Sequence, residues 1–190
     1  LMESSFNFQI EGTKPLSKLC LDKGLNDFES VCNYIQSLPY GRNTDRSNYS
    51  AILNENKGTC STKHAFLKQV AMEQNASHIQ FCLGIYKMQE HNTKGVGDVL
   101  SKYNLDYIPE AHTYLKFNND IIDFTRCVKS NTSFEDYLLF EEQIAPKQIG
   151  HYKIEIHKNF IKTWLITRKI PFTFEELWFV RESCIAALSI

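Results

Sequence analysis

The fold of this chain is decided by the stretch Gly58-Thr59-Cys60-Ser61-Thr62-Lys63-His64-Ala65-Phe66-Leu67. A glycine lets the backbone turn, and apolar residues then recur at helical spacing as far as Asn75, a residue type that commonly ends helices. Cys60 is therefore expected in the first turn of a helix, where unpaired backbone N–H groups and the helix dipole favour negative charge. Because such a position favours the thiolate form of a cysteine, Cys60 is a candidate nucleophile.

Composition limits the partners that the chain is expected to bind. Its 190 residues suffice for one domain with a substantial core, and its 21 Lys and Arg residues against 22 Asp and Glu residues give a net charge of -1. Binding of nucleic acid through its phosphates needs a basic surface, so no nucleic-acid partner is expected. A local basic patch is left open.

The sequence carries no pattern for membrane insertion or secretion. No apolar run is long enough to cross a bilayer and no signal-peptide pattern opens the chain, so we expect a cytoplasmic protein with no membrane partner. The chain has six cysteines, at Cys20, Cys32, Cys60, Cys82, Cys127 and Cys184. Because they are widely scattered, we expect reduced thiols and not a disulfide framework.

Several elements are expected before and after the Cys60 helix. Asn26 and Glu29 form a capping pair that opens a helix, and Pro39 closes it. Residues 40–57 are polar and rich in turn formers, which predicts a long loop of the kind that often carries function. The remaining pattern predicts strands at 6–10 and 79–85, a polar loop at 89–98 and a short helix at 99–103.

Two alternating segments about an asparagine-rich turn predict an antiparallel hairpin. Its strands are residues 109–117 and 121–125. If Asn118-Asn119 is the two-residue turn, Asp123 is the diagonal neighbour of His112 on the same face of the hairpin. A register shifted by two residues would bring this imidazole and carboxylate directly opposite or move them apart, depending on its direction.

The C-terminal part of the chain is expected to be mostly helical. Residues 134–140 predict a helix, residues 152–156 a strand and residues 159–168 a helix, and Thr173 with Glu176 forms a capping box that opens a last helix. The aromatic residues of this part are most simply core, and they are Phe160, Trp164, Phe174, Trp178 and Phe179. No linker divides the chain, so a single domain is expected over residues 1–190.

Cysteine chemistry at an amide needs a base that generates the thiolate and returns a proton, and a third group that orients the base. The expected hairpin supplies an imidazole at His112 and a carboxylate at Asp123. The order of a cysteine at a helix start, followed by histidine and aspartate on consecutive strands, is a demanding arrangement.

These features together resemble the transglutaminase-like superfamily of cysteine enzymes, a branch of the papain-like fold, and in particular its small bacterial-type members. GTCSTKHAFL resembles the family's Gly-x-Cys helix start, AHTYLKF at 111–117 its histidine strand and DIIDFT at 120–125 its Asp-x-Thr strand. The resemblance covers about residues 28–126. It implies an α+β domain in which the nucleophile helix packs on an antiparallel β-sheet, with a C-terminal helical extension over about residues 134–190.

By this resemblance Cys60 is the nucleophile, His112 the base and Asp123 the carboxylate that orients the imidazole. The implied activity is hydrolysis or acyl transfer at a peptide or protein amide through a thioester acyl-enzyme, without a metal or organic cofactor. The Cys60 backbone N–H is the expected first oxyanion donor. The family often has an aromatic residue beside the nucleophile, where this chain has Thr59 and Ser61. The second oxyanion donor is open among Tyr40, Asn43, Asn48 and Tyr49.

Other roles are open for the same residues. Taken alone, Cys60 fits a small buried hydrophobe, His112 a structural histidine and Asp123 a turn cap. His64 shares the helix face of Cys60 and is expected to pack near the thiol or tune it. Lys63 is expected on a solvated face, and tuning of the thiolate by its charge is the alternative.

Two further function classes compete with the enzyme. Cys60 and His64 have the spacing of half a zinc site that Cys82 or His78 would complete, but the chain has no second closely spaced ligand pair. A catalytically inactive transglutaminase-like protein that binds or scaffolds a partner is the main alternative to a cysteine hydrolase.

Overall fold

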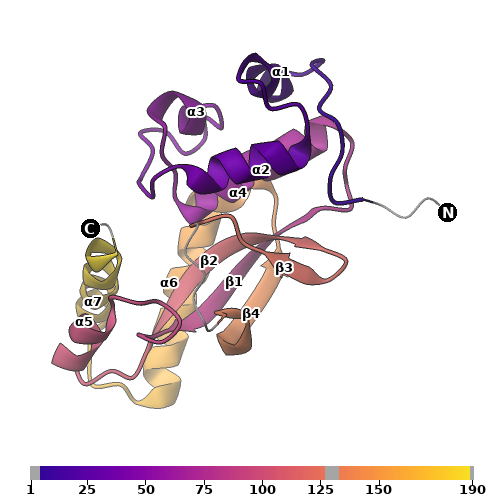
Figure 1. The fold of residues 1–190 in the computed structure, drawn as a ribbon. Helices are drawn as coiled ribbons and strands as arrows, with labels where there is room; N and C mark the ends of the chain where they lie inside the picture. The colour runs from indigo at the N-terminus through magenta and orange to yellow at the C-terminus, as the bar shows by residue number, and fades with distance from the viewer. Residues whose placement is uncertain (1–4, 127–132, 189–190) are drawn as a thin grey trace. The chain divides into compact units, whose positions relative to one another are not determined.

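The computed structural model of this chain describes residues 5–126 and 133–188. Within these residues the fold is α+β, as the sequence predicts, with a four-stranded antiparallel sheet in the order β3-β2-β1-β4 (Figure 1). None of the described helices is long and apolar enough to span a membrane. The five cysteines in the described part of the chain form no disulfide, and Cys127 lies outside it.

The described elements have the following bounds. The α-helices are α1 (Pro15–Asp22), α2 (Phe28–Ser37), α3 (Ala51–Glu55), α4 (Cys60–Glu73), α5 (Gly97–Lys102), α6 (His151–Arg168) and α7 (Phe174–Ala187). The strands are β1 (Gln80–Met88), β2 (Ile108–Phe117), β3 (Asp120–Ile122) and β4 (Leu138–Gln143). Two short 3₁₀-helices are η1 (Glu135–Tyr137) and η2 (Pro146–Ile149).

The chain forms two compact units. The described residues of the first are 5–83, 113–126 and 142–150, and those of the second are 84–112, 133–141 and 151–188. Strands β1, β2 and β4 each begin in one unit and end in the other. Each unit has a buried core of its own.

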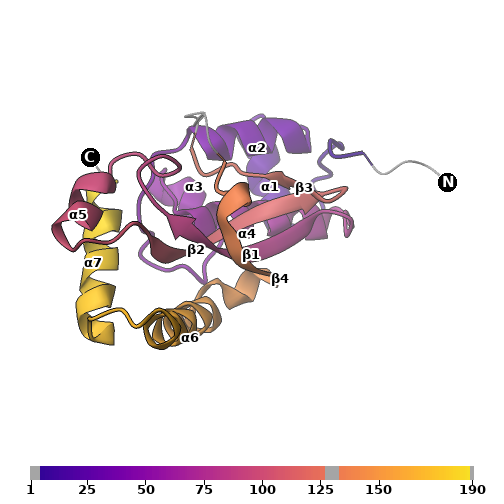
Figure 2. The same ribbon diagram turned by 90° about the horizontal axis from the view of Figure 1, so that it is seen from below.

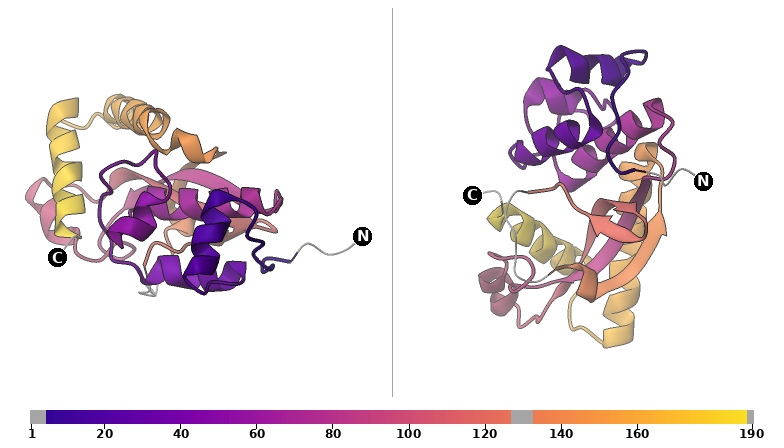
Figure 3. Two further views of the ribbon diagram at one scale, coloured as in Figure 1. Left: turned by 90° about the horizontal axis from the view of Figure 1, so that it is seen from above. Right: turned by 45° about the vertical axis from the view of Figure 1, so that its right-hand side comes forward.

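Helix α4 is the element on which the first unit is built. It packs against α1, α2, α3 and η2, so segments that precede and follow it in sequence share one core (Figures 1 and 3). Every residue from Cys60 through Lys68 is buried. A helix that is buried on all sides lies inside a core rather than on its surface.

Helix α2 presents one apolar face in this core. Its N-cap is Asp27, one residue later than the expected Asn26, and Asp27 Oδ1 accepts the Ser30 N–H at 2.8 Å. The apolar residues of this face recur at helical spacing, and each is 0% exposed. These residues are Phe28, Val31, Cys32 and Ile35. Leu38 is the C-cap, and the following Pro39 cannot continue the helix.

The hairpin of β2 and β3 has the predicted register. Leu115 pairs with Ile122 and Phe117 with Asp120, so the turn is Asn118-Asn119. Both asparagines have positive φ, 50° and 70°, as a two-residue turn of the I′ type requires. The expected strand over 121–125 is too long, because pairing ends at Ile122 and therefore does not reach His112.

Two expected elements in the C-terminal part are wrong. Residues 134–140 do not form an α-helix. They form η1 and the start of β4, whose residues alternate between half-buried and exposed as in an edge strand. Residues 152–156 are helical, because the buried residues of α6 recur at helical spacing, and they are His157, Ile161, Trp164 and Leu165.

Smaller differences concern the N-terminal part. The expected strand over 6–10 is reduced to one bridge between Gln9 and Asp27, and the expected loop over 40–57 contains α3. The capping box of Thr173 and Glu176 does open α7.

The core of the second unit forms where α5 and α6 each pack against α7 (Figure 2). Its buried members are Tyr86, Met88, Val96, Leu100, Ile108, Ile161, Trp164, Leu165, Leu177, Val180 and Cys184. The C-terminal aromatic residues lie in or beside this core with the exception of Phe179, which is 63% exposed.

A buried ion pair joins β2 to α7 in the second unit. Arg181 donates to the Glu110 carboxylate from Nε at 2.7 Å and also from Nη2. Burial alone would raise the pKa of Glu110, but the charges of Arg181 and His157 outweigh it and the pKa lies below its usual value. His157 donates from Nε2 to the Pro109 carbonyl at 2.8 Å, and burial lowers the pKa of its imidazole.

We expect His157 to make the protein less stable below about pH 6.5, the usual pKa of a histidine. Its pKa is lower in the folded than in the unfolded chain, so between the two values only the unfolded chain binds the proton. Stability therefore falls with falling pH, by up to about 1.4 kcal/mol per pH unit. His157→Gln keeps a donor for the Pro109 carbonyl and removes this dependence.

Urea unfolding of both proteins at about pH 7, 6 and 5 measures the difference. Glu110 does not interfere in this range, because a carboxylate with a lowered pKa loses its stabilising effect only below about pH 4.3. Parallel stability curves for the two proteins would contradict the assignment.

Candidate functional site

Cys60 is the first residue of α4, as the sequence predicts, and Thr59 is its N-cap. Thr59 and Thr62 form a reciprocal capping box, in which the Thr62 N–H donates to Thr59 Oγ1 at 3.3 Å and the Thr59 N–H donates to Thr62 Oγ1 at 2.9 Å. The capping box uses the N–H groups of Thr59 and Thr62, whereas the expected first oxyanion donor is the N–H of Cys60. The cysteine is 8% exposed, and its Sγ lies 3.9 Å from Ser61 Oγ.

Gly58 is required by lack of space and not by a turn. Its φ is not positive, but a Cβ on it would lie 2.8 Å from Ile52 Cδ1 and 3.0 Å from Lys63 Cγ. The Gly58 N–H donates to the Pro39 carbonyl at 3.1 Å, and the Gly41 N–H donates to the Gly58 carbonyl at 3.2 Å. The segment after α2 is therefore joined to the start of α4.

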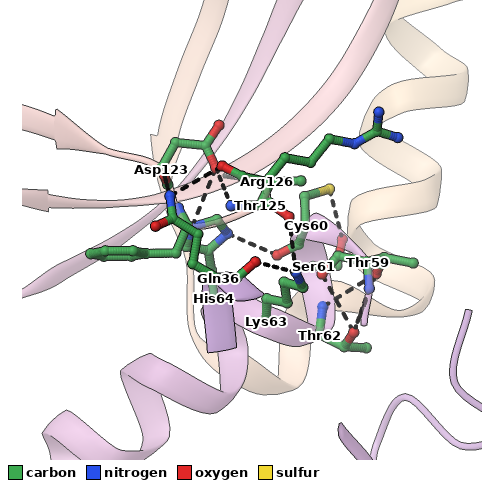
Figure 4. Close-up of polar contacts among 11 residues, drawn as sticks. Gln36, Thr59, Cys60, Ser61, Thr62, Lys63, His64, Asp123, Thr125 and Arg126 are labelled. Carbon is green, nitrogen blue, oxygen red and sulfur yellow. Dashed lines mark hydrogen bonds and ion pairs between the residues drawn. The ribbon is translucent and has the colours of Figure 1, made fainter. Parts of the chain in front are cut away.

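His64 connects the peptide group of Cys60 to the segment after β3 (Figure 4). Its side chain is fully buried, and its Nε2 accepts the Phe124 N–H at 2.8 Å. An Nε2 that accepts an N–H carries no proton, so in the neutral ring Nδ1 carries it and donates to the Cys60 carbonyl at 2.9 Å. The geometry therefore defines a neutral imidazole with both nitrogens in use.

Asp123 is a close neighbour of His64 in this segment. Asp123 Oδ1 lies 3.5 Å from His64 Nε2. Because Nε2 carries no proton in this tautomer, the contact is neither a hydrogen bond nor an ion pair. The structure thus places the Cys60 carbonyl at Nδ1 and the Asp123 carboxylate near Nε2 of one imidazole, that of His64. No catalytic role was expected for His64 from the sequence.

The carboxylate of Asp123 is anchored by Thr125. Asp123 Oδ1 accepts the Thr125 N–H at 2.8 Å and the Thr125 hydroxyl at 2.5 Å, and the Asp123 side chain is 29% exposed. This bond from Asp123 to the residue two positions further on closes a turn just after the end of β3. Asp123 therefore caps a turn, as the plainer expectation had it, and its carboxylate still has a defined position.

Lys63 and Gln36 also bind backbone groups of this segment (Figure 4). Lys63 is 0% exposed, so the expectation of a solvated face is wrong. Its Nζ donates to the carbonyls of Leu38, Thr125 and Gln36 at 2.6, 2.9 and 3.3 Å, and an ammonium has three N–H donors to match. Gln36 Nε2 donates to the Arg126 carbonyl at 3.1 Å.

His112 belongs to the second unit, on β2. Its half-buried ring meets Phe134 edge to face at 4.8 Å between centroids and Tyr86 at 6.1 Å. The rings of Tyr86 and Phe134 are themselves 5.5 Å apart, so the three rings form one cluster. These contacts define the orientation of the His112 ring within its own unit.

The structure distinguishes two of the four candidates for the second oxyanion donor, Asn43 and Tyr40. The Asn43 amide donates to the Lys57 carbonyl at 2.9 Å and to Glu55, so it is already used within its loop. Tyr40 pairs with Gly58, two residues before Cys60, and its ring lies 4.9 Å from the Arg126 guanidinium. The chain pairing therefore favours the Tyr40 segment over Asn43.

The zinc alternative finds no support in the geometry of His64. Both ring nitrogens make hydrogen bonds, so neither is available to a metal in this arrangement. Among the described residues there is no group of three or more His, Cys, Asp or Glu side chains placed to hold a metal ion.

Comparison with known proteins identified no relative of this chain. No protein-family model, no curated protein and no solved structure matches the chain.

Sequence reasoning missed the roles of Gln36, Lys63 and His64. The spacing does put Lys63 and His64 three and four residues after Cys60, on the same side of the helix. Apart from the Cys60 carbonyl, which lies four residues before His64, their partners are backbone groups of residues 25 to 62 positions away. Backbone groups carry no side-chain signature, so no residue pattern could identify these contacts.

We expect Lys63→Met to lower the free energy of unfolding by about 2–4 kcal/mol, because three buried carbonyls lose a charged donor. Lys68→Met is the matched control, since Lys68 is also buried in α4 but donates only to the Ile79 carbonyl at 2.5 Å. Its loss should be about 1 kcal/mol. Denaturant unfolding measures both, and equal losses would contradict the structural role of Lys63.

Proposed function

We propose that this protein is a cysteine-dependent amide hydrolase or acyl transferase with Cys60 as its nucleophile. The observation that carries the proposal is the position of Cys60 as the first residue of a capped helix of 14 residues. The positive end of the helix dipole, to which the N–H groups of the first turn contribute, favours a thiolate there. The same N–H groups favour the oxyanion that forms when a thiolate attacks a carbonyl.

The proposed reaction proceeds through a thioester. The Cys60 sulfur bonds to the carbonyl carbon of a peptide or protein amide, and the C–N bond then breaks. The leaving amine takes up the proton that came from the thiol. Attack of water on the thioester gives hydrolysis or deamidation, and attack of an amine gives acyl transfer.

His64 does not fit the role of the base, although it lies next to both Cys60 and Asp123. Its Nδ1 donates to the Cys60 carbonyl and its Nε2 accepts the Phe124 N–H, so neither nitrogen can exchange a proton without losing a hydrogen bond. The ring is also fully buried. A general base needs a nitrogen within reach of the transferred proton.

We assign the base to His112 and the orienting carboxylate to Asp123, as the resemblance implies. In the proposed cycle His112 removes the thiol proton and returns it to the leaving amine, and Asp123 stabilises the imidazolium that forms in between. Support comes from the fixed Oδ1 of Asp123 and from the aromatic contacts that orient the His112 ring. The proposed reaction needs no metal or organic cofactor.

Cys60 should react with iodoacetamide faster than the other thiols, and at a pH below the usual thiol pKa of about 8.5. Burial raises the pKa of Cys20 to about 12 and that of Cys184 to about 11, with smaller contributions from Glu73 and Glu110. These two cysteines are internal controls for unreactive thiols. Mass spectrometry of each cysteine over a pH series gives the rates.

The same series on His112→Ala tests the base. Loss of the low-pH reactivity of Cys60 alone supports a thiolate stabilised by the imidazolium. If Cys60 in the unaltered protein reacts no faster than Cys20 and Cys184, the enzyme proposal loses its basis. A catalytically inactive binding or scaffold protein is then the better interpretation. The burial of Cys60 is consistent with that alternative.

Acylation gives a second, independent test. With p-nitrophenyl acetate the protein should release p-nitrophenol in a burst and carry an acetyl group on Cys60 that hydroxylamine removes. Cys60→Ser should abolish the burst. An acetyl group found only on lysines would show that the ester reacts without the proposed nucleophile.

A further inference from the structure

The segment Asp123–Arg126 owes its position to side chains of two helices and not to a strand. Pairing of β3 ends at Ile122, and the next residues are held by Gln36 of α2 and by Lys63 and His64 of α4. A segment outside the ladder has no neighbouring strand to set its register. Its anchors therefore decide where the Asp123 carboxylate lies.

His64 differs from the other two anchors in what it joins. Gln36 and Lys63 donate to backbone carbonyls of the segment. His64 instead accepts a backbone N–H of the segment, that of Phe124. The other nitrogen of the same rigid ring binds the carbonyl of Cys60. The imidazole is thus a fixed spacer between the peptide group of the nucleophile and the residue next to the carboxylate (Figure 4).

We propose that His64 is a positioning residue that sets the Asp123 carboxylate relative to the Cys60 helix turn. The inference rests on the proposed function of Cys60 and Asp123, and it adds a residue that acts through Asp123 without touching substrate. The essential feature is an acceptor at the Nε2 position. Without it the Phe124 N–H is buried and unpaired, and Phe124 must move together with its neighbour Asp123.

Three substitutions separate this role from simple packing. His64→Phe keeps a ring of similar size and removes both hydrogen bonds. His64→Gln offers an acceptor at the reach of Nε2, and His64→Asn offers polar atoms only at the reach of Nδ1. We expect the Cys60 labelling rate at about pH 6 to fall about tenfold in His64→Phe and His64→Asn, and to recover largely in His64→Gln.

A double-mutant cycle shows whether His64 acts through Asp123. Asp123→Asn keeps the acceptor for the Thr125 N–H and removes the negative charge. If His64 only positions this carboxylate, the double variant His64→Phe with Asp123→Asn should label no more slowly than Asp123→Asn alone. Multiplication of the two single effects would overturn the proposal. A purely structural histidine would show that multiplication, since packing and charge are then independent.

The two hydrogen bonds of His64 can be measured without any labelling of Cys60. Amide hydrogen exchange of Phe124 should be slow in the unaltered protein and in His64→Gln, and about tenfold or more faster in His64→Phe. Nitrogen-15 spectra should show His64 protonated at Nδ1 only. Exchange at Phe124 that stays equally slow in His64→Phe would overturn the positioning role. An unreactive Cys60 in the unaltered protein would instead overturn the proposed function, and the two failures are thereby distinguished.

Discussion

A charged ammonium enclosed by backbone carbonyls is the contact on which the first unit depends. Lys63 has no exposed surface, and a charge out of water is tolerated only when polar groups surround it. Its partners come from the end of α2, from the residue after that helix and from the segment after β3. Three parts of the chain that share no strand pairing are therefore held at one point, next to the first turn of α4.

The two units satisfy buried charge in different ways. In the second unit Arg181 of α7 meets a carboxylate of β2, so two full charges compensate each other. In the first unit Lys63 meets neutral carbonyl dipoles, and His64 remains uncharged.

Local patterns were sufficient to predict several parts of this structure. The Cys60 helix start, the Asn118-Asn119 turn and the Thr173 capping box each depend on neighbouring residues, and each forms as expected. The failures depend on distant contacts or on competing short-range bonds. Residues 138–143 became a strand by joining a sheet edge. Beyond Ile122, where alternation alone would extend β3, the Phe124 N–H donates to His64 and the Thr125 N–H donates to Asp123. The same limit applies to the candidate site: Cys60 and Asp123 could be named from residue types, whereas the partners of Lys63 are carbonyls that every residue has.

The long sequence separation within the Lys63 contact also bears on how the chain is made. Thr125 lies 62 residues after Lys63, and its carbonyl is one of the three that the ammonium binds. A nascent chain that ends anywhere before this residue offers the lysine an incomplete set of acceptors, and its ammonium must stay in water. The helices that precede β1 are thus synthesised well before they can close around α4. The hairpin must therefore be synthesised before α4 can be enclosed in the core of its unit.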